Sequence, residues 1–374
     1  MRQVGLYLHI PFCVRKCAYC DFPSWSGREK WMEPYCDRVL QEIRSKARPD
    51  LEVSSVYIGG GTPSIYPLPL LQRLMDGLRD AFAFADDAEI SMEMNPGTFT
   101  ERVAEGAAAL GVNRVSMGMQ CAQPALLQRL RRIHTLSDVR DGMDLLRGAG
   151  IDNVNLDLMM GLPGQTMADA EESLKAALDM GCRHLSCYGL IVEEGTPLQA
   201  KVESGEWTLP DAETERQMYD LCLRLTESYG MKQYEISNFA YPGYACRHNL
   251  AVWRRGEYLG FGCSAAGMLD DVRVQNPRSL SEYMKGAEPE RTVLTPEDAM
   301  FESLMLGLRL NEGVSAAEFE RMHGRKLEAV YGAAWQKALR SGLLTYDEGV
   351  LRCTRRGMDV LNSILVDLLD AQDA

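Results

Sequence analysis

Strand-like and helix-like segments alternate through the first two hundred residues, and this alternation constrains the fold more than any other feature of the sequence. Short β-branched or aromatic runs predict strands, and the longer helical patterns between them predict helices. Such alternation indicates parallel βαβ units, whose right-handed crossovers curl a sheet toward a barrel. We expect strands at 5–10, 55–59, 89–94, 114–119, 153–159 and 184–192, and helices at 31–46, 68–82, 101–110, 124–132, 137–148 and 167–180.

Six such units are too few to close an eight-stranded barrel. We therefore expect an α/β fold, a partial (β/α)6 barrel of the TIM type, whose open side leaves space for a large ligand. Reactive residues of parallel α/β folds gather at the C-terminal ends of the strands. The predicted domains are a barrel of residues 1–205, an extension of residues 206–290 and a C-terminal domain of residues 291–374.

The pattern changes after residue 205. We expect a helix at 211–229, a strand at 233–236, and then a loop rich in glycine, proline and aromatic residues up to 267. Residues 296–374 resemble a winged helix, but they carry 9 basic and 13 acidic side chains, whereas nucleic-acid readers are normally basic. We therefore expect a lid or packing domain there. Its predicted elements are helices at 297–310, 315–323, 327–341 and 354–369 and a hairpin at 343–353.

Composition and charge exclude several classes of protein. Of the 374 residues, 46% are hydrophobic and 25% are charged, which is ordinary for a globular chain. The net charge of −13 disfavours broad binding to phosphate backbones, so we expect no nucleic-acid partner. No apolar run is long enough to span a membrane, and no leader is apparent. With an odd number of cysteines, eleven, we expect a reducing, cytoplasmic environment.

Three cysteines, Cys13, Cys17 and Cys20, lie within eight residues just after the first expected strand. In a tight loop their thiolates can reach one small inorganic centre. Structural zinc normally takes four protein ligands, and only three cysteines are close here. His9 could complete the set of four, but it lies within the expected strand. An iron–sulfur cluster on three cysteines instead leaves one iron open for a substrate or cofactor. We favour the cluster, while zinc or a group of reactive thiols stays open on the residues alone.

Glycines and polar side chains mark the ends of the strands that follow. Gly60, Gly61 and Thr62 end the second strand, where glycines allow a ligand to approach the backbone closely. Four polar side chains interrupt or follow apolar strands, and each alone is compatible with a satisfied core polar group. Together they favour a pocket for a polar, zwitterionic cofactor. These four are Glu93, Gln120, Arg132 and Asp157.

One histidine, His248, stands with Asn249 and Trp253 in the segment rich in aromatic residues and glycine. Such a histidine can ligate heme iron while Trp253 packs on the flat macrocycle. On the chemistry alone, a loop histidine that satisfies a backbone group is the favoured interpretation.

The Cys-x3-Cys-x2-Cys spacing, with Tyr19 before the last cysteine, resembles the motif of the radical S-adenosylmethionine superfamily. Over essentially its full length the chain resembles the HemW heme chaperone group of that superfamily. The resemblance implies a [4Fe–4S] cluster on Cys13, Cys17 and Cys20, with S-adenosylmethionine on the open iron. The contacts implied for S-adenosylmethionine are Tyr7, Tyr19, Gly60, Gly61, Thr62, Glu93, Gln120, Arg132 and Asp157.

The resemblance also reverses the interpretation of His248. The heme chaperone group carries a His-Asn-x-x-Tyr-Trp motif, which His248, Asn249 and Trp253 match, while Val252 replaces the tyrosine. This implies heme or another tetrapyrrole as ligand and His248 as the suspected iron ligand. It further implies a heme-acceptor protein and an electron donor for the cluster, with any membrane association being peripheral and through the acceptor.

The alternative function is that of a radical enzyme. The heme chaperone group is related to oxygen-independent coproporphyrinogen III dehydrogenase, which converts propionate chains to vinyl groups by oxidative decarboxylation. That oxidase group has a fourth cysteine two residues after the third, where Phe22 stands here, and a longer segment before the cluster motif. We therefore expect a heme chaperone, and we assign no catalytic residue.

Overall fold

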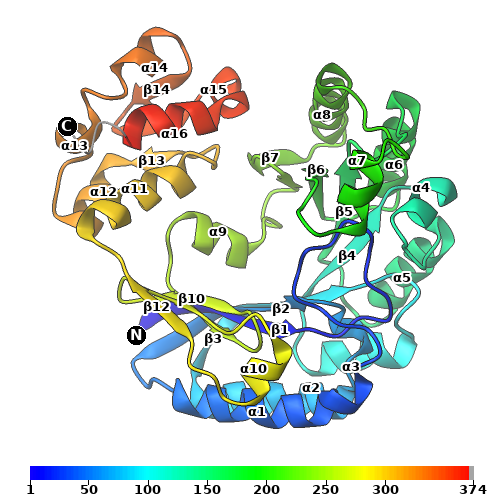
Figure 1. Cartoon of the computed structure of the whole chain (residues 1–374). Helices are drawn as coiled ribbons and strands as arrows, with labels where there is room; N and C mark the ends of the chain where they lie inside the picture. Colours follow the sequence, from blue (N-terminus) through cyan, green and yellow to red (C-terminus); the bar gives the residue numbers. More distant parts are fainter. Residues whose placement is uncertain (370–374) are drawn as a thin grey trace.

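The computed structural model describes residues 1–369, in which a single twelve-stranded sheet curls into an open barrel (Figure 1). Six parallel strands form its middle, in chain order, and all six were predicted from the sequence. The expected α/β partial barrel is therefore confirmed. The six strands are β1 (Arg2–Ile10), β2 (Leu51–Gly60), β3 (Ala83–Met94), β4 (Arg114–Gln120), β5 (Val154–Met160) and β6 (His184–Gly189).

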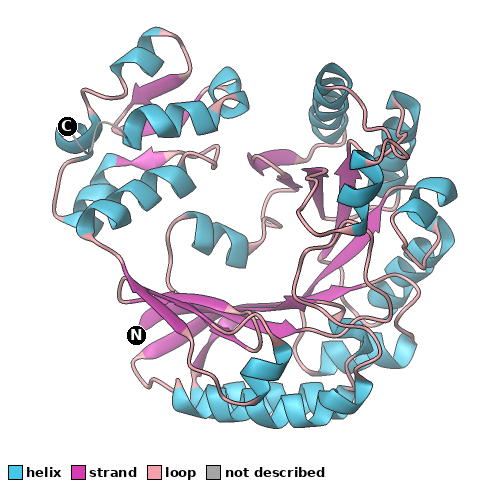
Figure 2. Ribbon diagram, in the orientation of Figure 1, coloured by secondary structure: helices cyan, strands magenta, loops and turns pink. Residues whose placement is uncertain are grey.

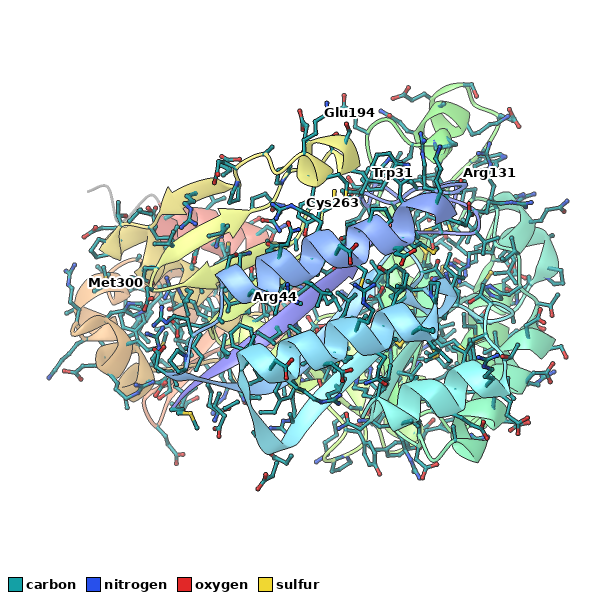
Figure 3. All side chains as sticks on the ribbon, turned by 90° about the horizontal axis from the view of Figure 1, so that it is seen from below. Trp31, Arg44, Arg131, Glu194, Cys263 and Met300 are labelled. Carbon is teal, nitrogen blue, oxygen red and sulfur yellow. The ribbon has the colours of Figure 1, made fainter. Side chains whose placement is uncertain are left out.

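Helices cover the outer, convex face of this sheet (Figure 2). Alternate strand residues such as Leu6, Ile58 and Met92 are buried in the main hydrophobic core, which also includes apolar side chains of the helices. From below, α1 and α2 run across this face, with Trp31 and Arg44 near opposite ends of α1 (Figure 3). The helices are α1 (Met32–Ser45), α2 (Leu68–Ala81), α3 (Glu101–Ala109), α4 (Pro124–Arg129), α5 (Leu136–Gly148) and α6 (Met167–Asp179), with short 3-10 turns η1 (Glu29–Trp31) and η2 (Pro63–Ile65).

Both edges of the six-stranded sheet are extended by strands from residues 232–293. The segment up to residue 267 is not the loop that the sequence predicted, because backbone pairing to the edges of the barrel orders it. The domain boundaries at 205 and 290 stay a prediction. The added elements are α7 (Pro197–Glu203), α8 (Ala212–Ser228), β7 (Lys232–Glu235), β8 (Asn238–Ala240), α9 (Arg247–Trp253), β9 (Tyr258–Phe261), β10 (Ala266–Leu269), β11 (Val272–Gln275), α10 (Leu280–Met284) and β12 (Glu290–Val293).

The C-terminal part has its own hydrophobic core and a small antiparallel sheet, as a winged-helix-like arrangement requires. The helix expected at 327–341 is divided into two short helices, with residues 332–335 in turns between them. Its elements are α11 (Pro296–Gly307), β13 (Val314–Ser315), α12 (Ala316–His323), α13 (Leu327–Tyr331), α14 (Gln336–Arg340), β14 (Leu344–Asp347), β15 (Val350–Cys353), α15 (Arg355–Asp359) and α16 (Leu361–Leu369).

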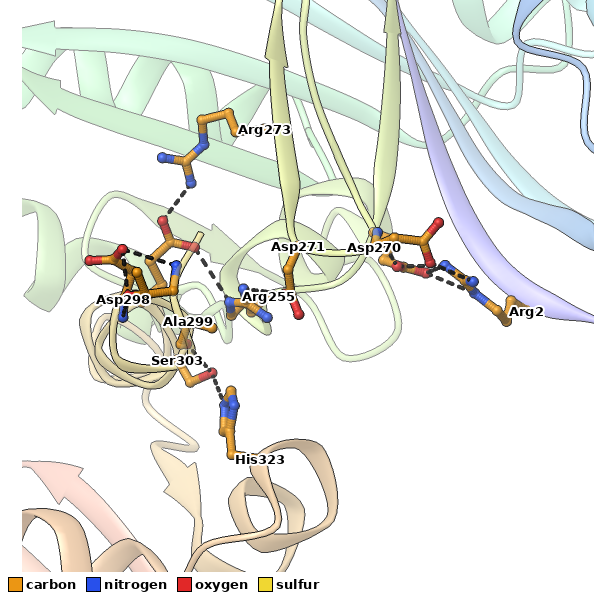
Figure 4. Close-up of polar contacts among 12 residues, drawn as sticks. Arg2, Arg255, Asp270, Asp271, Arg273, Asp298, Ala299, Ser303 and His323 are labelled. Atoms are coloured by element: carbon orange, nitrogen blue, oxygen red, sulfur yellow. Dashed lines mark hydrogen bonds and ion pairs between the residues drawn. The ribbon is translucent and has the colours of Figure 1, made fainter. Parts of the chain in front are cut away.

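Ion pairs join the C-terminal part to the edge of the large sheet (Figure 4). The Glu302 carboxylate on α11 accepts from Arg255 Nε at 3.4 Å and from Arg273 Nη2 at 2.7 Å, and Arg255 also reaches Asp271 at 2.7 Å. Since Arg255 and Glu302 are both buried, loss of either side chain would leave an unpaired buried charge between α11 and the barrel. Within residues 1–369, no helix combines the length and apolar character needed to cross a membrane.

Helix α9 lies on the concave side of the sheet, above β1 and β2 (Figure 1). The buried carboxylate of Glu89, on β3, accepts hydrogen bonds from the backbone N–H groups of Arg247 and His248, at 3.0 and 3.1 Å. These are two of the N–H groups that a helix leaves unpaired in its first turn. The buried guanidinium of Arg114 on β4 provides nearby positive charge. Glu89 therefore anchors the helix that carries the predicted heme motif.

We expect Glu89→Ala to lower the free energy of unfolding by roughly 3 kcal/mol, because it leaves the N–H groups of Arg247 and His248 without their acceptor and removes one of the negative charges near the buried Arg114. Glu89→Gln keeps an acceptor oxygen, so its loss should be smaller. Asp86→Ala, an exposed position on the same strand, serves as the control and should change stability by less than about 0.5 kcal/mol. Equal stability of Glu89→Ala and Asp86→Ala in chemical denaturation would contradict this anchoring role.

Candidate functional site

An open cavity of about 430 Å³ lies at the C-terminal ends of the parallel strands. Eleven of the twelve residues predicted to hold the cluster and S-adenosylmethionine border it, and they come from separate loops and strands. The twelfth, Tyr7, lines a neighbouring cavity instead. The eleven are Cys13, Cys17, Tyr19, Cys20, Gly60, Gly61, Thr62, Glu93, Gln120, Arg132 and Asp157.

The three cysteines lie on the loop that follows β1. Backbone hydrogen bonds shape this loop: Cys13 N donates to the Trp25 carbonyl at 3.0 Å, and Ala18 N donates to the Leu130 carbonyl at 3.0 Å. Cys13 is buried, and Cys17 and Cys20 are half-buried at the cavity wall. In residues 1–369, no three histidine, cysteine or acidic side chains converge closely enough for a single metal ion. The three thiols border one common cavity, and their ligation of an iron–sulfur cluster stays a prediction.

The end of β2 packs directly against the cysteine loop. A Cβ at Gly61 would lie 2.6 Å from the Phe12 carbonyl oxygen and 3.0 Å from Cys13 Sγ, so only glycine fits there. The backbone N–H of Thr62 donates to the same Phe12 carbonyl at 2.7 Å. Gly60 has a φ of 118°, which side chains other than glycine rarely adopt. This contact fixes the cysteine loop beside the cavity.

Glu93 stands at the end of β3 on the cavity wall. One carboxylate oxygen accepts from the Gly60 N–H at 3.0 Å, and the other accepts from the Tyr57 hydroxyl at 3.1 Å. Burial, followed by the nearby charge of Asp157, raises the pKa of Glu93 to about 7. A cationic amino group in the cavity would favour the ionised carboxylate, because an opposite charge lowers such a pKa again.

Arg132 spans the cavity wall between the cysteine loop and β4. Its Nη2 donates to Asn95 Oδ1 at 2.8 Å and to the Gly118 carbonyl at 2.6 Å, and its Nη1 donates to Cys17 Sγ at 3.5 Å. In the described part of the chain, the buried Nε has no hydrogen-bond partner. Because Arg132 lines the cavity, its positive charge suits an anionic group of a ligand there, such as a carboxylate.

Gln120 and Asp157 complete the wall on neighbouring strands. Gln120 has a φ of 65° at the end of β4, next to a register irregularity after Gly118. Asp157 accepts from Asn155 Nδ2 at 2.7 Å and from Ser116 Oγ at 3.0 Å, and burial raises its pKa. The wall therefore offers both donors and acceptors, as a zwitterionic nucleoside cofactor requires.

A second cavity of about 340 Å³ adjoins the first, and the two share Tyr57, Tyr188 and Asn249 as lining residues. His248, Asn249 and Trp253, together with Val252, line the second cavity. Their segment is helix α9 rather than the expected loop, because Glu89 binds its first N–H groups. The predicted heme motif therefore lies directly beside the predicted cofactor site.

His248 is buried, with its ring 5.4 Å from the ring of Tyr57. Its Nδ1 is 2.9 Å from Ser55 Oγ, and no hydrogen bond within residues 1–369 occupies Nε2. Burial lowers the pKa of His248 to about 4. At neutral pH the ring is therefore uncharged, which is the form that ligates metals.

Sequence reasoning missed two residues that connect these cavities to the rest of the fold. Tyr57 touches His248 with its ring and Glu93 with its hydroxyl, so it forms part of the wall between the cavities. The period-two alternation of β2 could have placed it on the concave face. Arg309 lines the second cavity from the C-terminal part, and no local sequence pattern predicts that contact.

Comparisons with known proteins agree with this arrangement. The radical SAM superfamily model matches residues 7–177, and the HemN C-terminal domain model matches residues 294–360. The heme chaperone HemW of Bacillus subtilis is 34% identical over 369 residues, which cover 96% of this chain and 97% of that protein. The heme chaperone HemW of Escherichia coli is 36% identical over an alignment of 376 positions, which covers 97% of each chain.

A solved structure matches over nearly the whole length. Coproporphyrinogen III oxidase (HemN) from Escherichia coli, described as a radical SAM enzyme, superposes with a TM-score of 0.86 at 26% identity. The match covers 98% of this chain and 90% of that chain.

We expect anaerobic reconstitution to load about four irons per chain, and we expect Cys17→Ala to abolish the charge-transfer absorbance of the cluster, because two thiolates cannot hold it. Cys353→Ala removes a half-buried thiol of the C-terminal part and serves as the matched control, which should load fully. A complete cluster in the Cys17→Ala protein, measured by iron content and absorbance, would refute the assignment.

The raised pKa of Glu93 predicts a pH-dependent stability. Between its ordinary value of 4.5 and its folded value of about 7, the native state binds more protons than the unfolded state, so stability falls as pH rises. Across this interval the wild type should lose roughly 1–3 kcal/mol of unfolding free energy that Glu93→Gln keeps. Water in the cavity screens part of the electrostatic effect and so limits the size of this difference. Urea denaturation at several pH values measures this difference, with the exposed Glu101→Gln as control. A difference that stays constant with pH would be the contrary result.

Proposed function

Since this chain belongs to the HemW heme chaperone family of the radical S-adenosylmethionine superfamily, we propose that it binds heme and transfers it to an acceptor protein. The family carries a [4Fe–4S] cluster and S-adenosylmethionine, and we propose that both occupy the first cavity. Heme would occupy the second cavity, with His248 as its iron ligand. The acceptor protein and an electron donor for the cluster are the partners that this function requires.

We propose that Cys13, Cys17 and Cys20 ligate the cluster. When bound, such a cluster supplies a single electron at an iron that S-adenosylmethionine can reach. The Glu93 carboxylate beside Gly60 would hold the amino group of the cofactor, and the unused Nε–H of Arg132 would meet its carboxylate. Gly61, Thr62, Tyr19, Gln120 and Asp157 would complete the binding surface, which they already border.

The observation that carries the heme assignment is the state of His248. The ring lines the second cavity, its Nδ1 lies 2.9 Å from Ser55 Oγ, and its Nε2 makes no hydrogen bond within the described residues, while burial lowers the pKa of the ring to about 4. A histidine whose other nitrogen is held by a hydrogen bond is fixed in orientation for metal ligation. Val252 replaces the aromatic residue of the family motif, so heme is held here without that side chain.

A cytoplasmic location is part of this proposal. All eleven cysteines are free thiols, including the eight outside the cluster loop. Free thiols in this number are typical of a reducing compartment, because oxidising compartments pair them as disulfides.

We expect titration of ferric heme to give a Soret band that His248→Ala weakens and shifts, because the variant removes the axial ligand. His323→Ala, a histidine of the C-terminal part that contacts Ser303, serves as the matched control and should bind heme like the wild type. The heme-loaded wild type should also pass its heme to an apocytochrome, and His248→Ala should pass less.

Two outcomes would overturn the proposal. An unchanged heme spectrum and heme affinity in His248→Ala would show that His248 is not the iron ligand. Conversion of coproporphyrinogen III by the reduced, reconstituted protein, above a control without S-adenosylmethionine, would favour the enzyme to which the fold is also similar. The fourth cysteine of that enzyme group is Phe22 here, with 62% of its surface exposed.

A further inference from the structure

We infer that Arg309 and the indole N–H of Trp253 form a carboxylate-binding site in the second cavity, which takes a propionate group of the bound tetrapyrrole. The inference rests on the proposed function, because it assumes that heme enters this cavity. It gives the C-terminal part a direct role in ligand recognition. Neither residue was predicted to bind a carboxylate.

Both side chains line the second cavity and touch each other. The guanidinium carbon of Arg309 lies 4.4 Å from the centroid of the Trp253 ring, which is a close cation–π contact. Arg309 follows α11 in the C-terminal part, whereas Trp253 ends α9 on the barrel side. The site is therefore built across the junction of these two parts of the chain.

Each side chain has a donor without an acceptor. Arg309 Nε and Trp253 Nε1 are buried, and neither has a hydrogen-bond partner in the described part of the chain. A buried donor left unpaired costs about 1–3 kcal/mol. Both residues border the second cavity, so an acceptor group of a ligand there would relieve both costs once the two side chains turn these donors toward it.

The charge of the site favours a carboxylate over a neutral acceptor. Arg309 Nη2 lies 3.3 Å from Glu235 Oε2, the nearest acidic group. The Glu235 carboxylate also accepts from the Ser237 N–H at 2.8 Å and from Asn238 Nδ2 at 2.5 Å. Both loop donors bind Oε1, while Arg309 Nη2 serves Oε2 of this buried carboxylate, which also lines the cavity. Arg309 keeps Nε and Nη1 for a second anion. Guanidinium–carboxylate hydrogen bonds are about twice as strong as neutral ones.

The backbone holds Arg309 in place. Glu235 and Leu310 form an isolated antiparallel bridge, and Asn311 N donates to the Tyr234 carbonyl at 3.0 Å. Arg309 thus sits on a segment pinned to β7 rather than on a free loop. Such a fixed position suits a group that orients the macrocycle while His248 ligates its iron.

The test compares ferric heme with its dimethyl ester, in which both carboxylates are blocked. We expect the wild type to bind heme about tenfold more tightly than the ester. Arg309→Gln should lose about tenfold in heme affinity while its affinity for the ester stays unchanged, so the preference disappears. Arg254→Gln, whose native side chain pairs with Glu312 on the surface, serves as the matched control and should keep the full preference.

A second variant keeps the test valid if Arg309→Gln folds poorly. Trp253→Phe retains a ring under the guanidinium and removes only the N–H donor, so it should reduce the preference for heme about threefold. A wild-type protein that binds heme and ester equally, or an Arg309→Gln protein that retains the preference, would overturn the inference. The Soret spectrum distinguishes this failure from failure of the function, because His248 ligation persists in one case and is absent in the other.

Discussion

Successive residues of each parallel strand face opposite sides of the sheet, and the whole functional arrangement depends on how this alternation is used. Leu6, Ile58 and Met92 lie in the core that the outer helices share, and this burial is the main stabilisation of the barrel. The intervening positions turn polar side chains toward the concave face, among them Glu89, Arg114 and Asp157. Because such groups are costly to bury unpaired, the Glu89 carboxylate accepts from the first N–H groups of α9, and the Asp157 carboxylate accepts from Asn155 and Ser116. The same alternation therefore supplies both the stability of the fold and the chemistry of the site.

The two cavities are neighbours that share part of their walls. Tyr57, Tyr188 and Asn249 border both, and Tyr57 joins the Glu93 carboxylate to the ring of His248. In the proposed function, the cluster and S-adenosylmethionine would thus lie one side chain away from heme. The C-terminal part contributes Arg309 to the second cavity, and the buried Arg255–Glu302 pair fixes that part to the sheet.

The parallel strands and the first cavity were largely predictable from the sequence, because both follow from local signals. Hydrophobic runs predict buried strands, and polar residues at their ends must meet at one edge of a parallel sheet. Helix α9 was not predictable in this way, since its first turn depends on Glu89, which lies more than 150 residues earlier in the chain. Arg309 was missed for the same reason, and Tyr7 was expected at the first cavity although it lines the second. Long-range contacts of this kind leave no periodic trace in a single sequence.

The most direct measurement is a crystal structure of the anaerobically reconstituted protein with heme and S-adenosylmethionine. The account predicts an iron–sulfur cluster on Cys13, Cys17 and Cys20, with its fourth iron facing the first cavity. It also predicts heme in the second cavity, with its iron on His248 Nε2. A lone zinc ion between the cysteines, or heme bound away from His248, would contradict the account.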